Sequence, residues 1–295
     1  MILLTTPTGA IGRQLLTTLL AADDEPIRVI ARDPSRLPAE IRERVEVIPG
    51  SHGDAAVLAQ ALPGAEAVFW LPPPALQAPS LAAAYLDFTR PLCQGLRDHG
   101  VKRVVSVSAL GRGSPWVDRA GFVTASLAMD ALIAATGVAF RALTMPSFMD
   151  NVLRQVDAIR SRGVFVSPLA GDRRVPTCAT GDIAAAAAKL LLDPSWGGAD
   201  SVPVLGPEDL SLNDMAQIMT EVLGKPVRFQ PVSFEAFHAG LLGRGVSGAM
   251  AQGLVDMMRA KNEGLDNAEP RTAANTTPTS FRVWCEAVLK PAVVA

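Results

Sequence analysis

Two glycines near the start of the chain have the spacing of a phosphate-binding turn. Gly9 and Gly12 follow a short apolar run, residues 2–4, and open a segment whose apolar residues recur every three to four positions. A helix that begins there presents unpaired N–H groups and a partial positive charge, which suit a pyrophosphate. The first glycine position of G-x-x-G-x-x-G holds Thr6, so the motif is incomplete. By itself it is equally typical of an ordinary strand–turn–helix connection.

An arginine occupies the position that normally determines which nucleotide a strand–turn–helix unit of this kind prefers. Arg32 ends the apolar run Ile27–Ala31 and comes 20 residues after Gly12 (32 − 12). A unit that prefers NAD usually carries Asp or Glu about 20 residues past the turn, to bind the ribose hydroxyls. A guanidinium instead pairs with a 2′-phosphate through two parallel hydrogen bonds, unless it is simply a solvated side chain after a strand. We therefore expect NADP(H) rather than NAD(H), with Arg13 and Arg36 as weaker candidates of the same kind.

Composition limits the class of protein. The chain has 295 residues, of which 49% are apolar and 19% charged, and a formal net charge of −2. This is a globular protein without the basic surface that nucleic acid or an anionic membrane requires. The three cysteines and three histidines are scattered, which argues against a disulfide framework or a metal site. With no signal peptide and no apolar run of about 18 residues, we expect a cytoplasmic monomer or homodimer acting on a small molecule.

Alternating strand and helix patterns predict an α/β fold. After the first two strands, β-rich apolar strings recur at residues 45–48, 67–71, 103–107 and 138–143, with helical periodicity at 55–61, 80–99 and 124–136. Strands that are apolar on both faces indicate a Rossmann-type, doubly wound parallel sheet between helical layers. We expect this domain to span residues 1–150, with a later return of the chain near 175–206.

The second half of the sequence predicts a smaller, mostly helical lobe over residues 151–295. Asp182 is expected to cap an alanine-rich helix over 183–192, and Ser211 or Asn213 to cap an amphipathic helix that ends at Leu223. A short strand at 227–231 and helices at 233–242 and 249–262 follow. The stretch 263–280, rich in Asn, Thr and Pro, is expected to be an exposed loop before a last helix.

The sequence lacks the usual acid of ketone-reducing short-chain dehydrogenases, a Tyr whose pKa is lowered by a Lys four residues on. The one tyrosine, Tyr85, is not followed by a lysine at position 89, and residues 120–136 contain neither residue type. Ser108, at the end of the fifth predicted strand, is a candidate for a hydrogen bond to a substrate oxygen. As a lone hydroxyl without a base it could equally cap the following turn, and Asp130 could be a solvated helix charge.

Residues near the ends of the predicted strands supply the remaining candidates, because ligands bind at the carboxyl ends of parallel strands. For the cofactor they are Thr6, Thr8, Gly9, Ile11, Gly12, Arg32, Leu71, Pro72, Pro73 and Ser108. For a flat, apolar substrate they are Trp70, Trp116, Phe122, Phe148, Met149 and Asn151. Each of the aromatic and apolar residues is as readily explained as core; their grouping at strand ends favours a ligand site.

Five segments in order resemble the NmrA-like family of atypical short-chain dehydrogenases, and most closely its triphenylmethane- and quinone-reductase branch. They are ILLTTPTGAIG, VIARDPSRL, VKRVVSVSALG, PSFMDN and GPEDLSLNDMAQIMTEVLGKPVRFQPVSFEAF. The resemblance implies a Rossmann fold, an NAD(P)(H) site at the carboxyl ends of the strands, and a substrate cleft between two lobes. The chain departs from the family at Thr6, at Ser51-His52, where Asp-Leu is common, and at Thr144-Met145-Pro146, where Arg-Pro-Gly is common.

Hydride chemistry that needs no enzyme-bound acid fits these residues. A quinone, a cationic dye, an iminium ion or a similar electron-poor acceptor takes hydride and collects any proton from water. We therefore expect an NADPH-dependent oxidoreductase of such acceptors. The alternative is a non-catalytic NAD(P)-binding sensor or regulator of the NmrA type, and a scaffold that has lost the cofactor is a third hypothesis, resting on Thr6.

Overall fold

The computed structural model describes residues 1–22 and 25–294. The chain forms two compact units that alternate along the sequence. Unit 1 comprises Met1–Ser108, Ala125–Thr144 and Ile183–Val202, and unit 2 comprises Ala109–Thr124, Met145–Asp182 and Pro203–Ala295. Unit 2 thus takes the segment 109–124, which the sequence pattern left inside the nucleotide-binding domain.

Unit 1 is built on a seven-stranded sheet in the order β10-β6-β5-β4-β1-β2-β3. Its strands are β1 (Ile2–Thr5), β2 (Ile27–Ala31), β3 (Glu46–Pro49), β4 (Ala67–Trp70), β5 (Arg103–Ala109), β6 (Ala139–Met145) and β10 (Ala199–Pro203). The pairs β1–β2, β1–β4, β2–β3 and β4–β5 are all parallel. The α/β fold expected from the alternating pattern is therefore confirmed.

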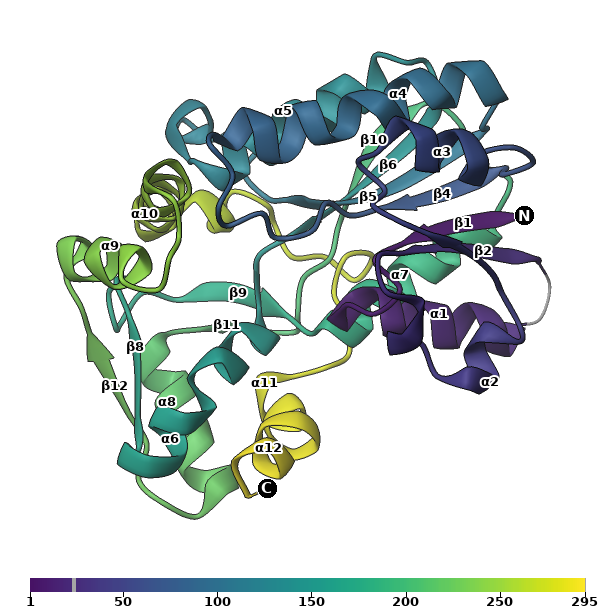
Figure 1. Ribbon diagram of the computed structural model, residues 1–295. Coiled ribbons are helices and arrows are strands. Elements are labelled where there is room, and N and C mark those ends of the chain that lie inside the picture. The colour runs from purple at the N-terminus through teal and green to yellow at the C-terminus, as the bar shows by residue number, and fades with distance from the viewer. Residues whose placement is uncertain (23–24, 295) are drawn as a thin grey trace. The chain divides into compact units, whose positions relative to one another are not determined.

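Helices cover both faces of this sheet. They are α1 (Ala10–Ala22), α2 (Ala39–Arg42), α3 (Ala55–Ala61), α4 (Phe88–His99), α5 (Phe122–Ala134) and α7 (Thr180–Leu192). Figure 1 shows α3, α4 and α5 on one face and α1, α2 and α7 on the other. Leu3, Leu4 and Val29 have no exposed surface, because both faces of the central strands are covered.

The sheet reverses its direction of growth beside β1. The chain first adds β2 and β3 on one side of β1, and then returns to add β4, β5 and β6 on the other. Such a reversal leaves a crevice outside the carboxyl ends of the two central strands, where doubly wound folds bind their ligands. The residues that follow β1, β2, β4 and β5 are therefore the ones to examine for a site.

The predicted helix over 80–99 is continuous from residue 81 but contains a π-helical segment. A π-helical turn, Ala83–Asp87, precedes α4, and Pro91 lies inside the first turn of α4. Proline has no N–H, and its ring crowds the carbonyl group four residues earlier, so the α-helical ladder cannot run through this point unchanged. Gly100 ends α4 in the left-handed conformation, at φ +65°, as its position predicts.

Unit 2 is mostly helical and carries two small sheets. One contains β7 (Ser147–Phe148), β9 (Val175–Cys178) and β11 (Asp209–Leu210), and the other pairs β8 (Val164–Ser167) with β12 (Arg228–Pro231) in parallel. Its helices are α6 (Val156–Arg162), α8 (Leu212–Leu223), α9 (Phe234–Leu242), α10 (Gly248–Asn262), α11 (Phe281–Trp284) and α12 (Lys290–Val294). The short strand and both helices predicted between 227 and 262 are present.

Capping residues set several of these helix ends. Ser211 caps α8 in a reciprocal capping box with Asp214, which decides between the two expected caps. Asp182, by contrast, does not cap the alanine-rich helix, because α7 begins earlier, at Thr180. Its carboxylate lies in the first turn and accepts hydrogen bonds from the backbone N–H and the hydroxyl of Thr279, at 3.1 and 2.8 Å. The predicted cap at Asp182 was wrong.

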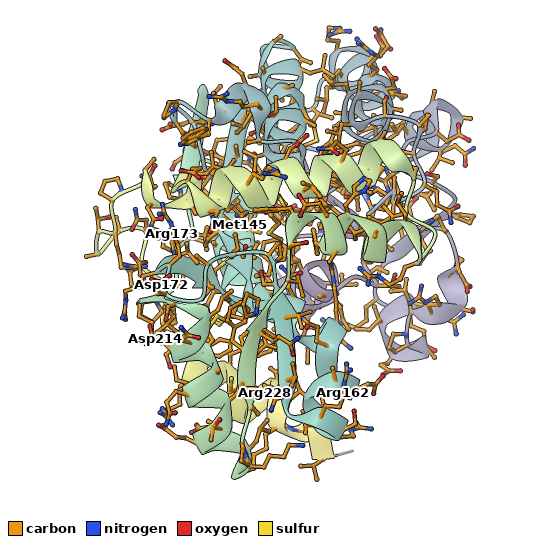
Figure 2. All side chains as sticks on the ribbon, turned by 90° about the vertical axis from the view of Figure 1, so that its left-hand side faces the viewer. Met145, Arg162, Asp172, Arg173, Asp214 and Arg228 are labelled. Carbon is orange, nitrogen blue, oxygen red and sulfur yellow. The ribbon has the colours of Figure 1, made fainter. Side chains whose placement is uncertain are left out.

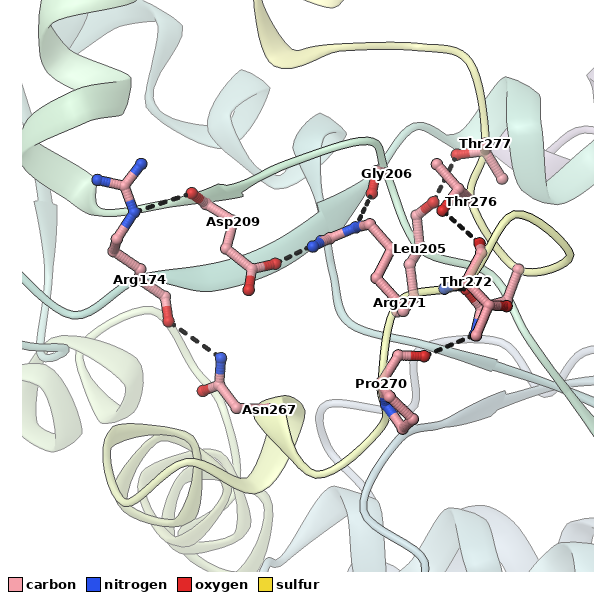
Figure 3. Close-up of polar contacts among 11 residues, drawn as sticks. Arg174, Leu205, Gly206, Asp209, Asn267, Pro270, Arg271, Thr272, Thr276 and Thr277 are labelled. Atoms are coloured by element: carbon pink, nitrogen blue, oxygen red, sulfur yellow. Dashed lines mark hydrogen bonds and ion pairs between the residues drawn. The ribbon is translucent and has the colours of Figure 1, made fainter.

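The loop over 263–280 is held to unit 2 by polar contacts. Arg271 pairs with the Asp209 carboxylate and donates from Nε to the carbonyl oxygen of Gly206 at 2.8 Å, as Figure 3 shows. Asn267 donates to the carbonyl oxygen of Arg174 at 3.1 Å, and Thr277 N–H to that of Leu205 at 2.7 Å. The stretch expected to be merely exposed is thus an ordered segment fixed at several points.

Unit 2 has its own apolar core around Phe281, Trp284 and Met219, none of which is more than 2% exposed. Unit 2 also carries charged side chains. In Figure 2, Asp172 and Arg173 lie near Asp214, while Arg162 and Arg228 lie together at another part of the unit. Arg228 N–H donates to the carbonyl oxygen of Gly163, which fixes β12 to the end of α6.

Candidate functional site

The turn between β1 and α1 brings backbone atoms unusually close. A Cβ built on Gly12 would lie 2.0 Å from the carbonyl oxygen of Thr6, whereas a Cβ on Gly9 would lie 3.4 Å from the same atom. That carbonyl oxygen also accepts a hydrogen bond from Gly9 N–H at 3.0 Å. Gly12 is therefore required for α1 to approach the strand end, and Gly9 has room for a small side chain or for a ligand.

Thr6 takes the backbone conformation that a glycine would normally take. Its φ is +52°, and among the described residues it is the one non-glycine with a positive φ. The left-handed conformation costs an L-residue roughly 1–2 kcal/mol. The Thr6 hydroxyl is buried and has no hydrogen-bond partner in the described chain. A phosphate group at the N-terminus of α1 fits this turn, because it would supply the acceptor that the hydroxyl lacks.

Arg32 follows β2 at the same edge of the sheet, and its side chain is exposed. The next residue, Asp33, accepts hydrogen bonds from the backbone N–H and the hydroxyl of Ser35, at 3.0 and 2.6 Å. These two bonds lower the pKa of the Asp33 carboxyl and keep it within its own turn. The neighbouring carboxylate is thus engaged elsewhere, which leaves the Arg32 guanidinium available to an anion.

The backbone of Leu71 is held at both of its polar groups. Its N–H donates to the Thr5 hydroxyl at 3.1 Å, and that hydroxyl donates to the carbonyl oxygen of Phe69 at 2.9 Å. Its carbonyl oxygen accepts from Nε2 of His52 at 3.0 Å. Pro72 and Pro73, which follow, have no N–H and fixed φ. The segment that leaves β4 is therefore a stiff wall at the carboxyl edge of the sheet.

His52 is the residue in this group to which the sequence pattern gave no role. Its ring lies edge-on to Trp70 and Phe88, with centroid distances of 5.0 and 4.9 Å. Burial lowers the pKa of His52 to about 4, with a smaller contribution from the charge of Arg32. The ring is therefore neutral near pH 7, with its proton on Nε2, where the carbonyl oxygen accepts it. The signal in the sequence was the replacement of Asp-Leu by Ser51-His52.

Ser108 is not a lone hydroxyl. It donates to Oδ2 of Asp130, while Ser106 donates to Oδ1 of the same carboxylate at 3.3 Å, and Ser126 lies 3.3 Å from the Ser108 oxygen. Asp130 is 1% exposed, so the expectation of a solvated helix charge was wrong. Ser126 and Asp130 are one helical turn apart in the largely apolar α5, and this polar pair was the signal available in the sequence.

Two of the residues expected to line the substrate site belong to apolar cores. Trp70 has no exposed surface, packs in the core of unit 1 and donates from Nε1 to the Thr89 hydroxyl at 3.1 Å. Met149 is 1% exposed and packs in the core of unit 2. Side chains enclosed in this way cannot contact a ligand without rearrangement, which corrects the expectation for both of them.

The other substrate candidates are accessible and all belong to unit 2. Trp116, with the guanidinium of Arg119 4.9 Å from its ring centroid, Phe122 and Phe148 are partly exposed. Asn151 is exposed in the 3-10 turn Met149–Gln155. Of the cofactor candidates, Thr8 and Leu71 are half-buried and Ile11 is buried in the first turns of α1. The structure does not assign a ligand to any of these residues.

Three further observations bear on chemistry elsewhere in the chain. Cys93, Cys178 and Cys285 are free and buried, and burial raises the pKa of each thiol, so none of them is a ready nucleophile. Among the described residues, no group of His, Cys, Asp and Glu has the arrangement of a metal site. No helix in the described part is both long and apolar enough to span a bilayer.

The doubly wound sheet, with its glycine-containing turn before α1, has the fold of a dinucleotide-binding protein. A family model described as NAD(P)H-binding matches residues 7–194. The chain belongs to this family of NAD(P)H-binding proteins, in its NmrA-like reductase branch, as the resemblance implied. It is thus an NAD(P)H-dependent oxidoreductase.

Similar proteins are known by sequence and by structure. The (4-alkanoyl-5-oxo-2,5-dihydrofuran-3-yl)methyl phosphate reductase of Streptomyces griseus is 32% identical over 251 residues, which cover 83% of this chain and 81% of that protein. The NADP(H) complex of Citrobacter sp. triphenylmethane reductase superposes with a TM-score of 0.78 at 21% identity, over 96% and 98% of the two chains. The NADPH complex of Escherichia coli quinone oxidoreductase QOR2 gives 0.77 at 23% identity, over 100% and 99%. At these identities the two structures show the shared fold.

Proposed function

We propose that the protein transfers a hydride from NADPH to an electron-poor small molecule, such as a quinone, a cationic dye or an iminium ion, without a Tyr/Lys pair. Three similar proteins support this substrate class by what they reduce. One is named for a dihydrofuranone phosphate, one for triphenylmethane dyes and one for quinones. All three acceptors contain a conjugated, electron-poor carbon framework.

The place of Tyr85 is the observation that carries the proposal. The one tyrosine of the sequence lies in the π-helical turn Ala83–Asp87 and packs against the core of unit 1. Burial raises its pKa to about 12, the opposite of what a proton donor near neutral pH requires. Acceptors that take up hydride without a bound acid therefore suit this chain better than simple ketones do.

The residues that would hold NADPH come from three strand ends of unit 1. The turn from Thr6 to Gly12 would bind the pyrophosphate at the N-terminus of α1, and Arg32 would pair with the 2′-phosphate. The rigid segment from Leu71 to Pro73 would limit the position of the nicotinamide. When bound, NADPH supplies the hydride. The polypeptide then has to orient the nucleotide and exclude water, and the accessible aromatic residues Trp116, Phe122 and Phe148 are our candidates for contact with a flat acceptor.

The test is a panel of acceptors with NADPH absorbance as the readout. Quinones, triphenylmethane dyes, cyclic iminium ions and simple ketones are offered in turn, with NADPH and with NADH. We expect oxidation of NADPH with at least one of the first three classes and none with ketones. Turnover of ketones alone would contradict the proposal. Tight NADPH binding without oxidation by any of these classes would also contradict the proposed class of acceptor.

A further inference from the structure

The hydrogen bonds around Asp130 connect one face of β5 to one face of α5. Ser106 and Ser108 are two residues apart on the strand, so their side chains leave the same side of the sheet. Ser126 and Asp130 are four residues apart on the helix and also share a face. Both carboxylate oxygens of Asp130 accept from a serine, Oδ1 from Ser106 and Oδ2 from Ser108.

For an ionised Asp130, a count of protons gives a direction for each bond. A serine hydroxyl has one proton and two lone pairs, and an ionised carboxylate can only accept. The proton of Ser108 points to Asp130, so the 3.3 Å contact with Ser126 has Ser126 as its donor. One lone pair of Ser108 remains unused by these groups. Ser108 is 7% exposed, whereas Ser106 and Asp130 are at most 1% exposed, so Ser108 is the least buried of these three residues.

From this geometry we propose that Asp130 is a positioning residue that makes Ser108 a hydrogen-bond acceptor toward the ligand, and that Ser108 binds the carboxamide NH₂ of the nicotinamide. This proposal rests on the proposed function, because it takes the hydride acceptor to be a quinone, a cationic dye or an iminium ion. Unsubstituted quinones and cationic dyes whose nitrogens are fully alkylated have no O–H or N–H group that could donate to Ser108, whereas the carboxamide has one. Ser108 is also the last residue but one of β5, at the edge of the sheet where doubly wound folds bind their ligands. This reverses the sequence-based hypothesis that Ser108 donates to a substrate oxygen.

The direct test compares two oxidised nucleotides in equilibrium binding, so that no turnover is involved. NADP⁺ carries the carboxamide, and its 3-acetylpyridine analogue has a methyl group in place of the NH₂. We expect the wild-type protein to bind NADP⁺ more tightly than the analogue by roughly tenfold, the value of one good hydrogen bond. In Ser108→Ala this discrimination should fall to near unity, since the acceptor is gone.

Two further variants distinguish a role of Asp130 in orienting Ser108 from a role in stabilising the fold alone. Asp130→Asn can present its NH₂ to Ser108 and release the serine proton toward the ligand, so the discrimination should fall or reverse while the nucleotide still binds. Ser106→Ala removes the bond to the other carboxylate oxygen and should leave the discrimination at its wild-type value. Circular dichroism and urea unfolding of each variant show whether the fold is kept.

The outcomes distinguish this inference from the proposed function. Wild-type discrimination in Ser108→Ala would overturn the carboxamide contact, and wild-type discrimination in a folded Asp130→Asn would overturn the positioning role. Neither result would bear on the proposed function, which is tested by the oxidation of NADPH with the panel of acceptors. If Asp130→Asn does not fold, the Ser108→Ala comparison still decides whether Ser108 reads the carboxamide. Failure of the wild-type protein to bind NADP⁺ at all would count against the proposed function instead.

Discussion

Arg32 is exposed, and the neighbouring Asp33 carboxylate accepts hydrogen bonds from Ser35 within its own turn, so it does not neutralise the guanidinium. We predict that Arg32→Asp reverses the nucleotide preference, because the new carboxylate repels a 2′-phosphate and accepts bonds from free ribose hydroxyls. The affinity for NADPH should fall roughly ten- to a hundredfold. Titrations with NADPH and NADH measure it. Arg36→Asp, an equal change of charge four residues away, is the control and should have a much smaller effect.

We do not expect Tyr85 to act as a proton donor. Tyr85→Phe should change turnover of the best acceptor by less than about threefold, because the partly buried phenol with its raised pKa is not a proton donor. Loss of a true general acid would cost roughly 10²–10⁴-fold. Steady-state kinetics of the folded variant decide between the two. A loss of that size would mean that an enzyme-bound acid is used after all.

At the scale of elements, the junction of β1 with α1 depends on the contact between Gly12 and the Thr6 carbonyl oxygen. Gly12→Ala should lower the free energy of unfolding by about 1–3 kcal/mol, because the new methyl group meets backbone that cannot easily move. Gly9→Ala is the matched control, with a 3.4 Å contact, and should change stability by no more than about 0.5 kcal/mol. Urea unfolding of both variants measures this difference. Equal destabilisation would show that the turn relaxes around either side chain.

The connection between β4 and the segment that follows it depends on neutral His52. The unfolded imidazole takes up a proton below about pH 6.5, but the buried one does so only below about pH 4. Its contribution to stability is thus complete above about pH 6.5 and is lost as the pH falls toward 4. We expect this to cost the wild-type protein up to roughly 3 kcal/mol. His52→Gln keeps a donor for Leu71 without the titration, so its stability should fall less on acidification. If the free energy of unfolding, measured with urea, falls by the same amount in both proteins between pH 6.5 and 4, the assignment is wrong.

At the scale of the whole molecule, each unit is made of three separate segments, and the chain passes between the units repeatedly. No single cut would therefore release either unit as one piece. The nucleotide candidates that come from strand ends lie in unit 1, and binding there should stabilise the fold by mass action. NADPH at about 100 times its Kd should add about 2.7 kcal/mol to the free energy of unfolding. NADH at the same concentration should add less, and an identical gain from both would contradict the role given to Arg32.

The pattern of residues along the chain predicted the strands of the nucleotide-binding sheet, the helices between them and, as one of two candidates, the Ser211 cap. These features depend on neighbours in sequence: apolar periodicity, and side chains that bind backbone within one turn. The prediction failed where a side chain that can cap a helix binds a residue distant in sequence. Asp182 is such a case, because it binds Thr279 in place of capping a helix.

Residue types and their order were enough to predict the fold class and the family, and they show that Tyr85 has no lysine four residues on. The roles of single side chains depended on how the chain is packed. The tertiary structure turned Asp130 from a helix charge into the partner of Ser108, placed Trp70 and Met149 in apolar cores, and joined His52 to Leu71. Each of these contacts joins residues that are distant in sequence or depends on which face of an element is covered. Hydrogen-bond direction and burial are properties of that packing, and a linear pattern does not contain them.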